Sequence, residues 1–151
     1  PLPTNSVHMR AIVSYMNFLS QNIKTKDDLQ DNTGFVTINK ELIPNADNGK
    51  TLYVQHCASC HQLDGQGLYP NNTYMFPAIA GSQSFNDGAG MARTYTAAAF
   101  IKGNMPLGQE GMLTEQQAVD IAYYFSHLER PIFANKADDW PKGGAPKDVR
   151  R

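Results

Sequence analysis

The chain has 151 residues, the length of one ordinary domain, and 13 Lys and Arg stand against 14 Asp and Glu. This near-neutral balance, without a basic run or stripe, excludes the usual nucleic-acid-binding surface, and no apolar run approaches the roughly 20 residues of a membrane span. No segment has the layout of a signal peptide, and Pro1 comes first, so we expect a soluble, processed product or a piece of a longer protein.

Residues 5–20 predict an amphipathic helix at the start of the chain. Asn5 and Ser6 are good N-caps for such a helix. The apolar residues that recur at helical spacing are Met9, Ile12, Val13, Met16 and Leu19. Residues 24–47 mix charge with Asn, Gly and Pro and indicate a linker, within which residues 35–38, FVTI, are compatible with a short strand.

A second predicted helix carries residues 49–60, GKTLYVQHCASC, with Asp47 or Asn48 as its cap and its end near His61. Turn formers follow, and residues 70–93 are too rich in Gly, Pro, Asn and Ser for regular structure. Thr94 then opens a short helix, YTAAAFIKG, which Gly103 is expected to stop.

The last predicted helix begins with a capping box formed by Thr114 and Gln117. The apolar stripe that follows is Ala118, Ile121, Ala122, Phe125 and Leu128. Pro131 ends the helix, and the polar segment beyond is broken by Pro and Gly. Such a tail either wraps the domain or stays mobile.

Both cysteines of the chain lie in Cys57-Ala58-Ser59-Cys60-His61, which matches the C-x-x-C-H attachment signature of a c-type haem. On a helix the two sulfurs emerge about one turn apart on the same side, where they can form thioethers with the two vinyl groups. His61 follows directly, and its imidazole can then serve as the proximal iron ligand. The sequence therefore predicts one covalent haem c.

The cysteine pair fits two other kinds of site less well. A zinc site needs a second ligand pair of similar spacing, and the chain has no other cysteine. A thioredoxin-type dithiol needs a preceding strand and an αβ fold, whereas this sequence predicts helices and loops.

Met105 is the expected sixth ligand, because it follows the Gly103 helix stop and precedes Pro106, which fixes the backbone. Met91 is the second choice, whereas Met9 and Met16 fall on a helix stripe and predict core packing. The remaining rival ligands are Met75, Met112, His8, His56, His127 and Lys102. His56 is expected to face away from the haem, and His127 lies off the stripe of the last helix.

A haem pocket also needs supporting residues. The proximal imidazole must donate its other N–H to a fixed acceptor, and the carbonyl of Pro77 suits that role. Apolar groups must shield the ring, and the predicted ones are Leu52, Tyr53, Ile79, Phe100, Ile101, Leu107 and Tyr124. Arg93, Tyr74 and Trp140 are the proposed hydrogen-bond donors to the propionates.

The order of these features across residues 47–129 resembles the class I cytochrome c fold. That order is a capped helix ending in CxxCH, an irregular loop, a short helix, a Met-Pro loop and a long amphipathic helix. The resemblance implies an all-α cytochrome c fold with an extra N-terminal helix and an extended C-terminal tail. We expect an N-terminal helix and linker over 1–45, a cytochrome c domain over 46–130 and the tail over 131–151.

A narrower likeness covers nearly the whole chain. The strings FPAIAGSQSFNDGAGMARTYTAAAFIKGNMPLG, LTEQQAVDIAYYFSHLERP and DWPKGGAPKD resemble the second haem domain of dihaem cytochromes of the thiosulfate dehydrogenase group. PLPTNSVHMRAIVSYMNFLS resembles the end of the first haem domain of that group. In this family the substrate-converting haem belongs to the first domain and has a cysteine ligand, for which this chain has no spare cysteine.

The expected function is therefore that of a monohaem c-type cytochrome that passes single electrons through a His61/Met105-ligated haem. One alternative is the electron-relay half of a dihaem thiosulfate dehydrogenase or tetrathionate reductase. A second alternative is haem-based binding of a gas ligand at an open sixth position. We expect redox proteins, or a second haem domain or subunit, as partners. We expect neither nucleic acid nor a membrane span, and a periplasmic location after removal of a signal peptide.

Overall fold

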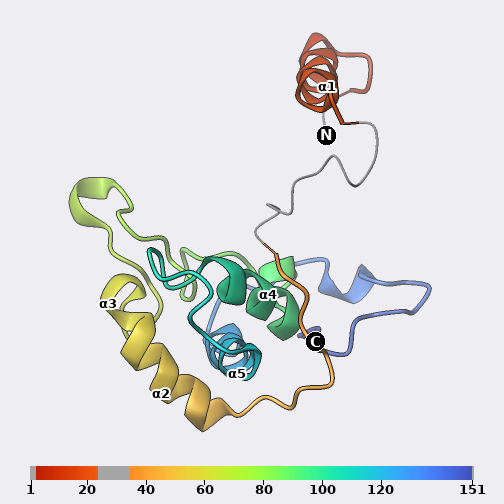
Figure 1. Ribbon diagram of the computed structural model, residues 1–151. Helices are drawn as coiled ribbons and strands as arrows, with labels where there is room; N and C mark the ends of the chain where they lie inside the picture. Colours follow the sequence, from red (N-terminus) through yellow and green to blue (C-terminus); the bar gives the residue numbers. More distant parts are fainter. Residues whose placement is uncertain (1–2, 24–34, 151) are drawn as a thin grey trace. The chain divides into compact units, whose positions relative to one another are not determined.

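The computed structural model describes residues 3–23 and 35–150 (Figure 1). The chain divides into two compact units, Pro1–Thr33 and Gly34–Arg151. The expected domain boundaries after residues 45 and 130 stay predictions.

The first unit contains the helix α1, Val7–Ser20. Ser6 caps it, since its Oγ accepts the N–H of Met9 at 3.2 Å. The predicted N-terminal helix is therefore confirmed. None of its residues is buried, and Val7, Met16 and Phe18 are each more than 60 % exposed.

The second unit holds four α-helices in the order α2 (Ala46–His56), α3 (Ala58–His61), α4 (Thr94–Asn104) and α5 (Glu115–Ser126). Three short 3-10 turns, η2 (Pro70–Asn72), η3 (Gly90–Ala92) and η4 (Lys136–Asp138), lie in the connecting loops. Across residues 3–23 and 35–150 no strand forms, and one isolated bridge joins Leu68 to Phe76. The predicted all-α class is confirmed.

Helix α2 begins earlier than expected and breaks within the cysteine motif. Its N-cap is Asn45 rather than Asp47 or Asn48, and the Asn45 side chain accepts the N–H of Asn48 at 3.0 Å. Asp120 of α5 accepts the Asn45 N–H at 2.9 Å, so a tertiary contact sets the start of the helix. The helix then breaks at Cys57, with φ −121° and ψ −36°, and α3 continues to His61.

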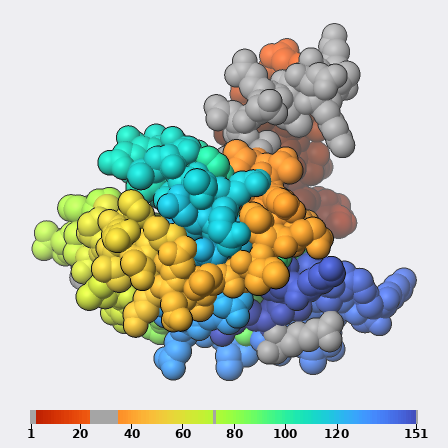
Figure 2. Space-filling view, turned by 60° about the horizontal axis from the view of Figure 1, so that its bottom comes forward, coloured from red at the N-terminus to blue at the C-terminus, as the bar shows by residue number. Residues whose placement is uncertain are grey.

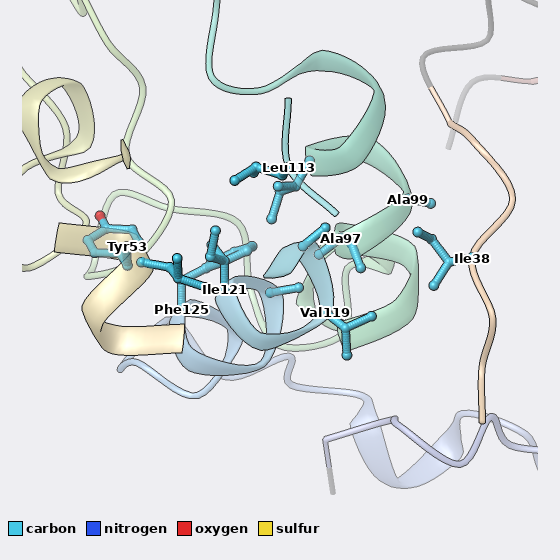
Figure 3. Packing of buried hydrophobic residues seen from close by; sticks show 13 residues of the cluster. Ile38, Tyr53, Ala97, Ala99, Leu113, Val119, Ile121 and Phe125 are labelled. Atoms are coloured by element: carbon cyan, nitrogen blue, oxygen red, sulfur yellow. The ribbon is translucent and has the colours of Figure 1, made fainter. Parts of the chain in front are cut away.

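The core is formed where α5 packs against both α2 and α4 (Figure 3). Tyr53 of α2 and Ile121 of α5 are fully buried, and the rings of Tyr53 and Tyr124 lie 5.4 Å apart. Gly49 permits this close approach, because a Cβ there would lie 2.6 Å from the carbonyl carbon of Asp120. The crossing of α2 and α5 therefore fixes the end of α2, at which Cys57 lies.

Helix α4 starts at Thr94 as predicted but runs one residue past Gly103, to Asn104. The Asn104 side chain donates Nδ2–H to the Phe100 carbonyl at 2.9 Å, which stabilises the last turn. Met105 is the C-cap residue and Pro106 follows it. The chain therefore leaves the helix at the residue that carries the predicted sixth ligand.

Helix α5 has the predicted capping box, with both reciprocal hydrogen bonds between Thr114 and Gln117 present. It ends at Ser126, two residues before Leu128 and ahead of Pro131. The Arg150 Nη1 donates to the Ser126 carbonyl at 2.7 Å, so a side chain of the tail satisfies a terminal carbonyl of this helix.

Residues 35–38 are not a strand. The N–H of Val36 donates to the Ala99 carbonyl of α4 at 3.3 Å, and the Ile38 side chain is 7 % exposed within the core. Ile38 therefore packs in the helical core, whereas Phe35 and Val36 are 48 % and 41 % exposed.

The C-terminal tail wraps the domain, which decides between the two alternatives left by the sequence. The N–H of Phe133 donates to Asp87 at 2.8 Å, and Lys136 forms an ion pair with the same carboxylate at 2.6 Å. Asp148 accepts the Tyr95 N–H in the first turn of α4 at 2.9 Å. Figure 2 shows this blue tail beside the orange segment that leads into α2.

Candidate functional site

The cysteine motif lies at the break between α2 and α3. The N–H of Cys57 still donates to the Tyr53 carbonyl of α2 at 2.9 Å, whereas the Cys57 carbonyl accepts the N–H of Cys60 at 3.2 Å and of His61 at 2.9 Å. Both cysteines are free and half-buried. The backbone thus places two unpaired thiols and an imidazole within one turn.

Burial, and secondarily the nearby Cys60, raise the pKa of the Cys57 thiol to about 11. This thiol is therefore protonated at neutral pH, unlike the low-pKa thiolate of a redox dithiol or a bare metal centre. In the described part of the chain, no three His, Cys, Asp or Glu side chains are grouped so that they could hold a metal ion.

The imidazole of His61 has a fixed acceptor. Its Nδ1 lies 2.9 Å from the carbonyl oxygen of Pro77, and because a carbonyl can only accept, Nδ1 must carry the hydrogen. In the neutral ring this leaves the Nε2 lone pair for a metal. The structure thus brings His61 and the Pro77 carbonyl together, the pair that the sequence suggested as ligand and acceptor.

Two glycines that sequence reasoning did not single out hold the Pro77 loop. Gly67, with φ +73°, donates its N–H to the His61 carbonyl at 2.9 Å, and Gly65 accepts the N–H groups of Ile79 and Ala80. A Cβ on Gly67 would lie 2.6 Å from the Pro77 carbonyl carbon. The string DGQG, residues 64–67, which begins three residues after His61, is the signal that the sequence offers, but it indicates only a turn.

Met105 is half-buried and packs against the core. Its N–H donates to the Ile101 carbonyl at 2.9 Å, which joins it rigidly to the end of α4. The following loop is tied back to α4, because Lys102 Nζ donates to the Gly111 carbonyl at 2.9 Å. Hydrogen bonds on both sides of Met105 therefore fix the backbone that carries its side chain.

The rival ligands differ in their surroundings. Met75 and Met112 are 62 % and 49 % exposed, while Met91 in η3 is half-buried against the core, as Met105 is. His127 Nδ1 donates to the Tyr123 carbonyl at 2.7 Å. Of the two other rival histidines, His8 in α1 is exposed and His56 at the end of α2 is half-buried.

The predicted apolar residues divide into core and surface groups. Tyr53, Leu52 and Ile101 are buried in the core, and the Tyr53 hydroxyl donates to the Gln62 carbonyl beside the motif at 2.8 Å. Burial, followed by nearby Cys57, raises the Tyr53 pKa, so its hydroxyl remains a donor. Of the others, Ile79 and Tyr124 are half-buried and Leu107 is 78 % exposed. The Phe100 ring lies 5.7 Å from the Phe35 ring at a tilt of 56°.

The three proposed propionate donors occupy different segments. Arg93 is the N-cap residue of α4, Tyr74 lies in the loop before Pro77 and is 39 % exposed, and Trp140 lies half-buried in the tail. A cleft of about 550 Å³ lies between the tail and the start of α4, and none of the sequence-predicted site residues except the rival ligand His127 lines it. The assignment of Arg93, Tyr74 and Trp140 to the propionates stays a prediction.

The donor chemistry fits a covalently held haem: two free thiols a turn apart, and an imidazole whose Nδ1 is occupied and whose Nε2 is available. The cytochrome c family model matches residues 46–129. The chain belongs to the cytochrome c family. Membership of this family implies covalent haem c, for which Cys57 and Cys60 fit the CxxCH motif, and it implies an electron-transfer role.

Proteins similar to this chain include several thiosulfate dehydrogenases. The one of Psychrobacter arcticus is 59 % identical over 151 residues, covering 99 % of this cytochrome and 46 % of that protein. The one of Allochromatium vinosum is 38 % identical, covering 85 % and 47 %. The solved thiosulfate dehydrogenase (TsdBA) of Marichromatium purpuratum matches with a TM-score of 0.70 at 39 % identity, covering 86 % of this chain and 28 % of that one.

This cytochrome is thus a class I c-type cytochrome related to the thiosulfate dehydrogenases, and it spans less than half the length of the two curated relatives. Within residues 3–23 and 35–150, none of the helices has the length and apolar character required to cross a membrane.

Proposed function

We propose that this cytochrome carries single electrons, and that His61 and Met105 would be the protein ligands of its haem iron. The observation that carries the proposal is the hydrogen bond from His61 Nδ1 to the Pro77 carbonyl, because it fixes the tautomer that a proximal ligand needs. When bound, the haem iron alternates between Fe(II) and Fe(III) and so carries one electron.

The residues of the chain have separate roles in this proposal. Cys57 and Cys60 tether the group, and the Pro77 carbonyl holds the His61 ring in one orientation. Met105 presents a thioether from the end of α4, and a thioether ligand favours the reduced state relative to a second imidazole. The packed core of α2, α4 and α5 keeps water from the buried side of the site.

Axial ligation by Met105 is tested by the sulfur-to-iron absorption band of the oxidised holo-protein. We expect the band in the wild type, its loss in Met105→Ala, and its retention in Met91→Ala, the matched control with similar burial. Wild-type protein without the band and with rapid CO binding to the reduced form would favour the gas-ligand alternative. Loss of the band in Met91→Ala alone would make Met91 the ligand.

The second function that we propose is electron relay within a longer thiosulfate dehydrogenase. It is supported by 59 % identity to the Psychrobacter arcticus enzyme across 99 % of this chain, and by the chain's span of 46 % of that enzyme. A second haem domain or subunit would then be the partner, and thiosulfate or tetrathionate the substrate of the whole protein. A periplasmic location follows, because covalent haem is attached outside the cytoplasm.

Haem content and intact mass of the protein purified from its source test the relay role. Two haems on a polypeptide longer than 151 residues would support it. One haem on a polypeptide of 151 residues would contradict the relay role and would support a self-contained single-electron carrier.

A further inference from the structure

Residues 67–76 form a hairpin that projects beside α3, between His61 and Pro77; we call it the tyrosine hairpin (Figure 1). The N–H of Leu68 donates to the Phe76 carbonyl at 2.9 Å, and the N–H of Met75 donates to the Leu68 carbonyl at 2.9 Å. At the tip, the N–H of Thr73 donates to the Pro70 carbonyl at 3.1 Å. The hairpin is therefore a hydrogen-bonded element and not a loose loop.

The tyrosine hairpin exposes apolar and aromatic side chains next to a polar tip that contains Asn71 and Thr73. Tyr69 is 52 % exposed, Tyr74 39 % and Met75 62 %, and the two tyrosine rings lie 4.3 Å apart. Rings that already lie against each other, here tilted by 47°, lose little side-chain freedom on binding, so such a surface contributes to affinity at small entropic cost. Exposed aromatic clusters on a projecting element are typical of protein-binding surfaces.

The surface also has no charge of its own. No Asp, Glu, Lys or Arg occurs between residues 65 and 86, and the chain as a whole has a net charge of −1. Long-range attraction between charges is therefore weak at this surface. A charged partner surface is disfavoured as well, because its charges would lose their hydration without forming ion pairs with the hairpin. The complementary surface is uncharged and apolar.

The hairpin is joined directly to the haem-attachment segment. Its first residue, Gly67, donates to the His61 carbonyl at 2.9 Å, and its last residue precedes Pro77, whose carbonyl accepts from His61 Nδ1. A protein seated on the hairpin therefore lies next to the segment that carries the proximal ligand. Proximity of this kind is what electron transfer between proteins requires.

We propose that the tyrosine hairpin docks a second electron-transfer domain through an uncharged, apolar face. The proposal rests on the proposed electron-carrier function. Each encounter moves one electron from the reduced cytochrome to the oxidised partner, and no covalent bond forms or breaks. The relatives provide room for such a domain, since this chain covers 46 % and 47 % of their lengths.

The test uses an electrode as a defined uncharged partner surface. Holo-protein is adsorbed on gold coated with mixed methyl- and hydroxyl-terminated alkanethiols, and its electron-exchange rate is measured by voltammetry. We expect Tyr69→Ser/Tyr74→Ser to lower the exchange rate by about tenfold or more, and Tyr69→Phe/Tyr74→Phe to preserve it, because the rings provide the contact. The wild-type rate should stay constant between about 10 and 500 mM salt.

Two controls accompany the electrode measurement. Ile132→Ser removes an apolar side chain that is 80 % exposed outside the hairpin and should leave the rate unchanged. Oxidation by ferricyanide in solution, which needs no apolar docking, should proceed equally in the wild type, in Ile132→Ser and in the single variant Tyr69→Ser, which leaves the predicted propionate donor Tyr74 in place. The hairpin tyrosines are outside the buried core, and circular dichroism of each variant checks that the fold is intact.

The proposal is overturned if the Ser variant exchanges electrons as fast as the wild type, or if Ile132→Ser slows exchange equally. It is also overturned if the wild type forms dimers that the Ser variant does not, because the hairpin would then bind a second copy of this chain. Absence of reversible one-electron chemistry with ferricyanide as well would contradict the electron-carrier function itself, which separates the two failures.

Discussion

At the scale of single residues, the position of the Pro77 carbonyl depends on Gly67. Gly67 has φ +73°, and a Cβ on it would lie 2.6 Å from the Pro77 carbonyl carbon. We expect Gly67→Ala to lower the free energy of unfolding of the holo-protein by about 3 kcal/mol or more, from backbone strain plus overlap. Urea denaturation followed by circular dichroism measures this loss.

Gly108→Ala is the matched control for that substitution. Gly108 has φ +81°, but nothing lies within 4 Å of the Cβ that it would gain. Only the strain of about 1–2 kcal/mol applies there, so the difference between the two variants isolates the contact with the Pro77 segment. Equal losses at both sites would show that the Pro77 loop moves aside freely.

At the scale of elements, the crossing of α2 and α5 depends on a missing side chain. An alanine in the middle of a helix normally stabilises it by about 0.5–1 kcal/mol relative to glycine. At Gly49 the sign should reverse, because the new Cβ would lie 2.6 Å from the Asp120 carbonyl carbon and 3.1 Å from the Tyr124 Cβ. We expect Gly49→Ala to lose about 2–3 kcal/mol of unfolding free energy in urea.

The control for this crossing is Lys50→Ala, on the exposed face of the same helix. Its effect on the free energy of unfolding should stay within about 0.5 kcal/mol. A Gly49→Ala variant that is more stable than the wild type would contradict the close approach of the two helices.

The attachment of the tail should make stability depend on pH. Burial opposes ionisation of Asp87, but the Lys136 hydrogen bond and the Phe133 N–H outweigh it and lower the pKa of this carboxyl. A lowered pKa in the folded state contributes stability that is present above the unfolded pKa of about 3.9 and is lost as pH falls through the folded pKa.

We therefore expect Asp87→Asn to cost about 2 kcal/mol at neutral pH, within the range of charged hydrogen bonds, and progressively less as pH falls below 4. Urea denaturation from pH 7 down to pH 2.5 measures the difference. The control is Asp138→Asn, because Asp138 is an exposed carboxyl in η4, the turn that also contains the Asp87 partner Lys136. This variant should show no such trend. A constant difference between Asp87→Asn and the wild type would contradict the ionic role of Asp87.

The same elements show why sequence predicts some of this structure and not the rest. The α5 capping box is a local signal within four residues, so the helix start was predictable. Contacts distant in sequence were not. Asp120, 75 residues away from Asn45, sets the start of α2, and Arg150, 24 residues beyond Ser126, contacts the end of α5.

The candidate site follows the same division. Cys57, Cys60 and His61 are adjacent in sequence, so a short motif predicts them and their cofactor. The Pro77 carbonyl was predicted from the need of an imidazole for an acceptor, but Gly65 and Gly67, which hold it, act through backbone geometry that composition does not reveal. The ligand role of Met105 stays a prediction, because half-burial alone does not separate it from Met91.

At the scale of the whole molecule, the two units differ in how their helices are stabilised. Helix α1 has 14 residues and buries none of them, whereas seven residues of α5 are buried. Isolated helices of this length are marginal in water, because most helical stability in proteins comes from tertiary packing. Backbone hydrogen bonds in α1 should therefore open far more often than those in α5.

Hydrogen exchange of the holo-protein, followed by mass spectrometry, tests this difference. We expect amides of residues 7–20 to exchange on the order of a thousandfold faster than those of residues 115–126. Met16→Lys, which changes a side chain that is 61 % exposed, should leave both the exchange rates and the thermal midpoint unchanged. Equal protection of the two helices, reduced in α1 by Met16→Lys, would mean that the apolar residues of α1 are packed against another surface in solution.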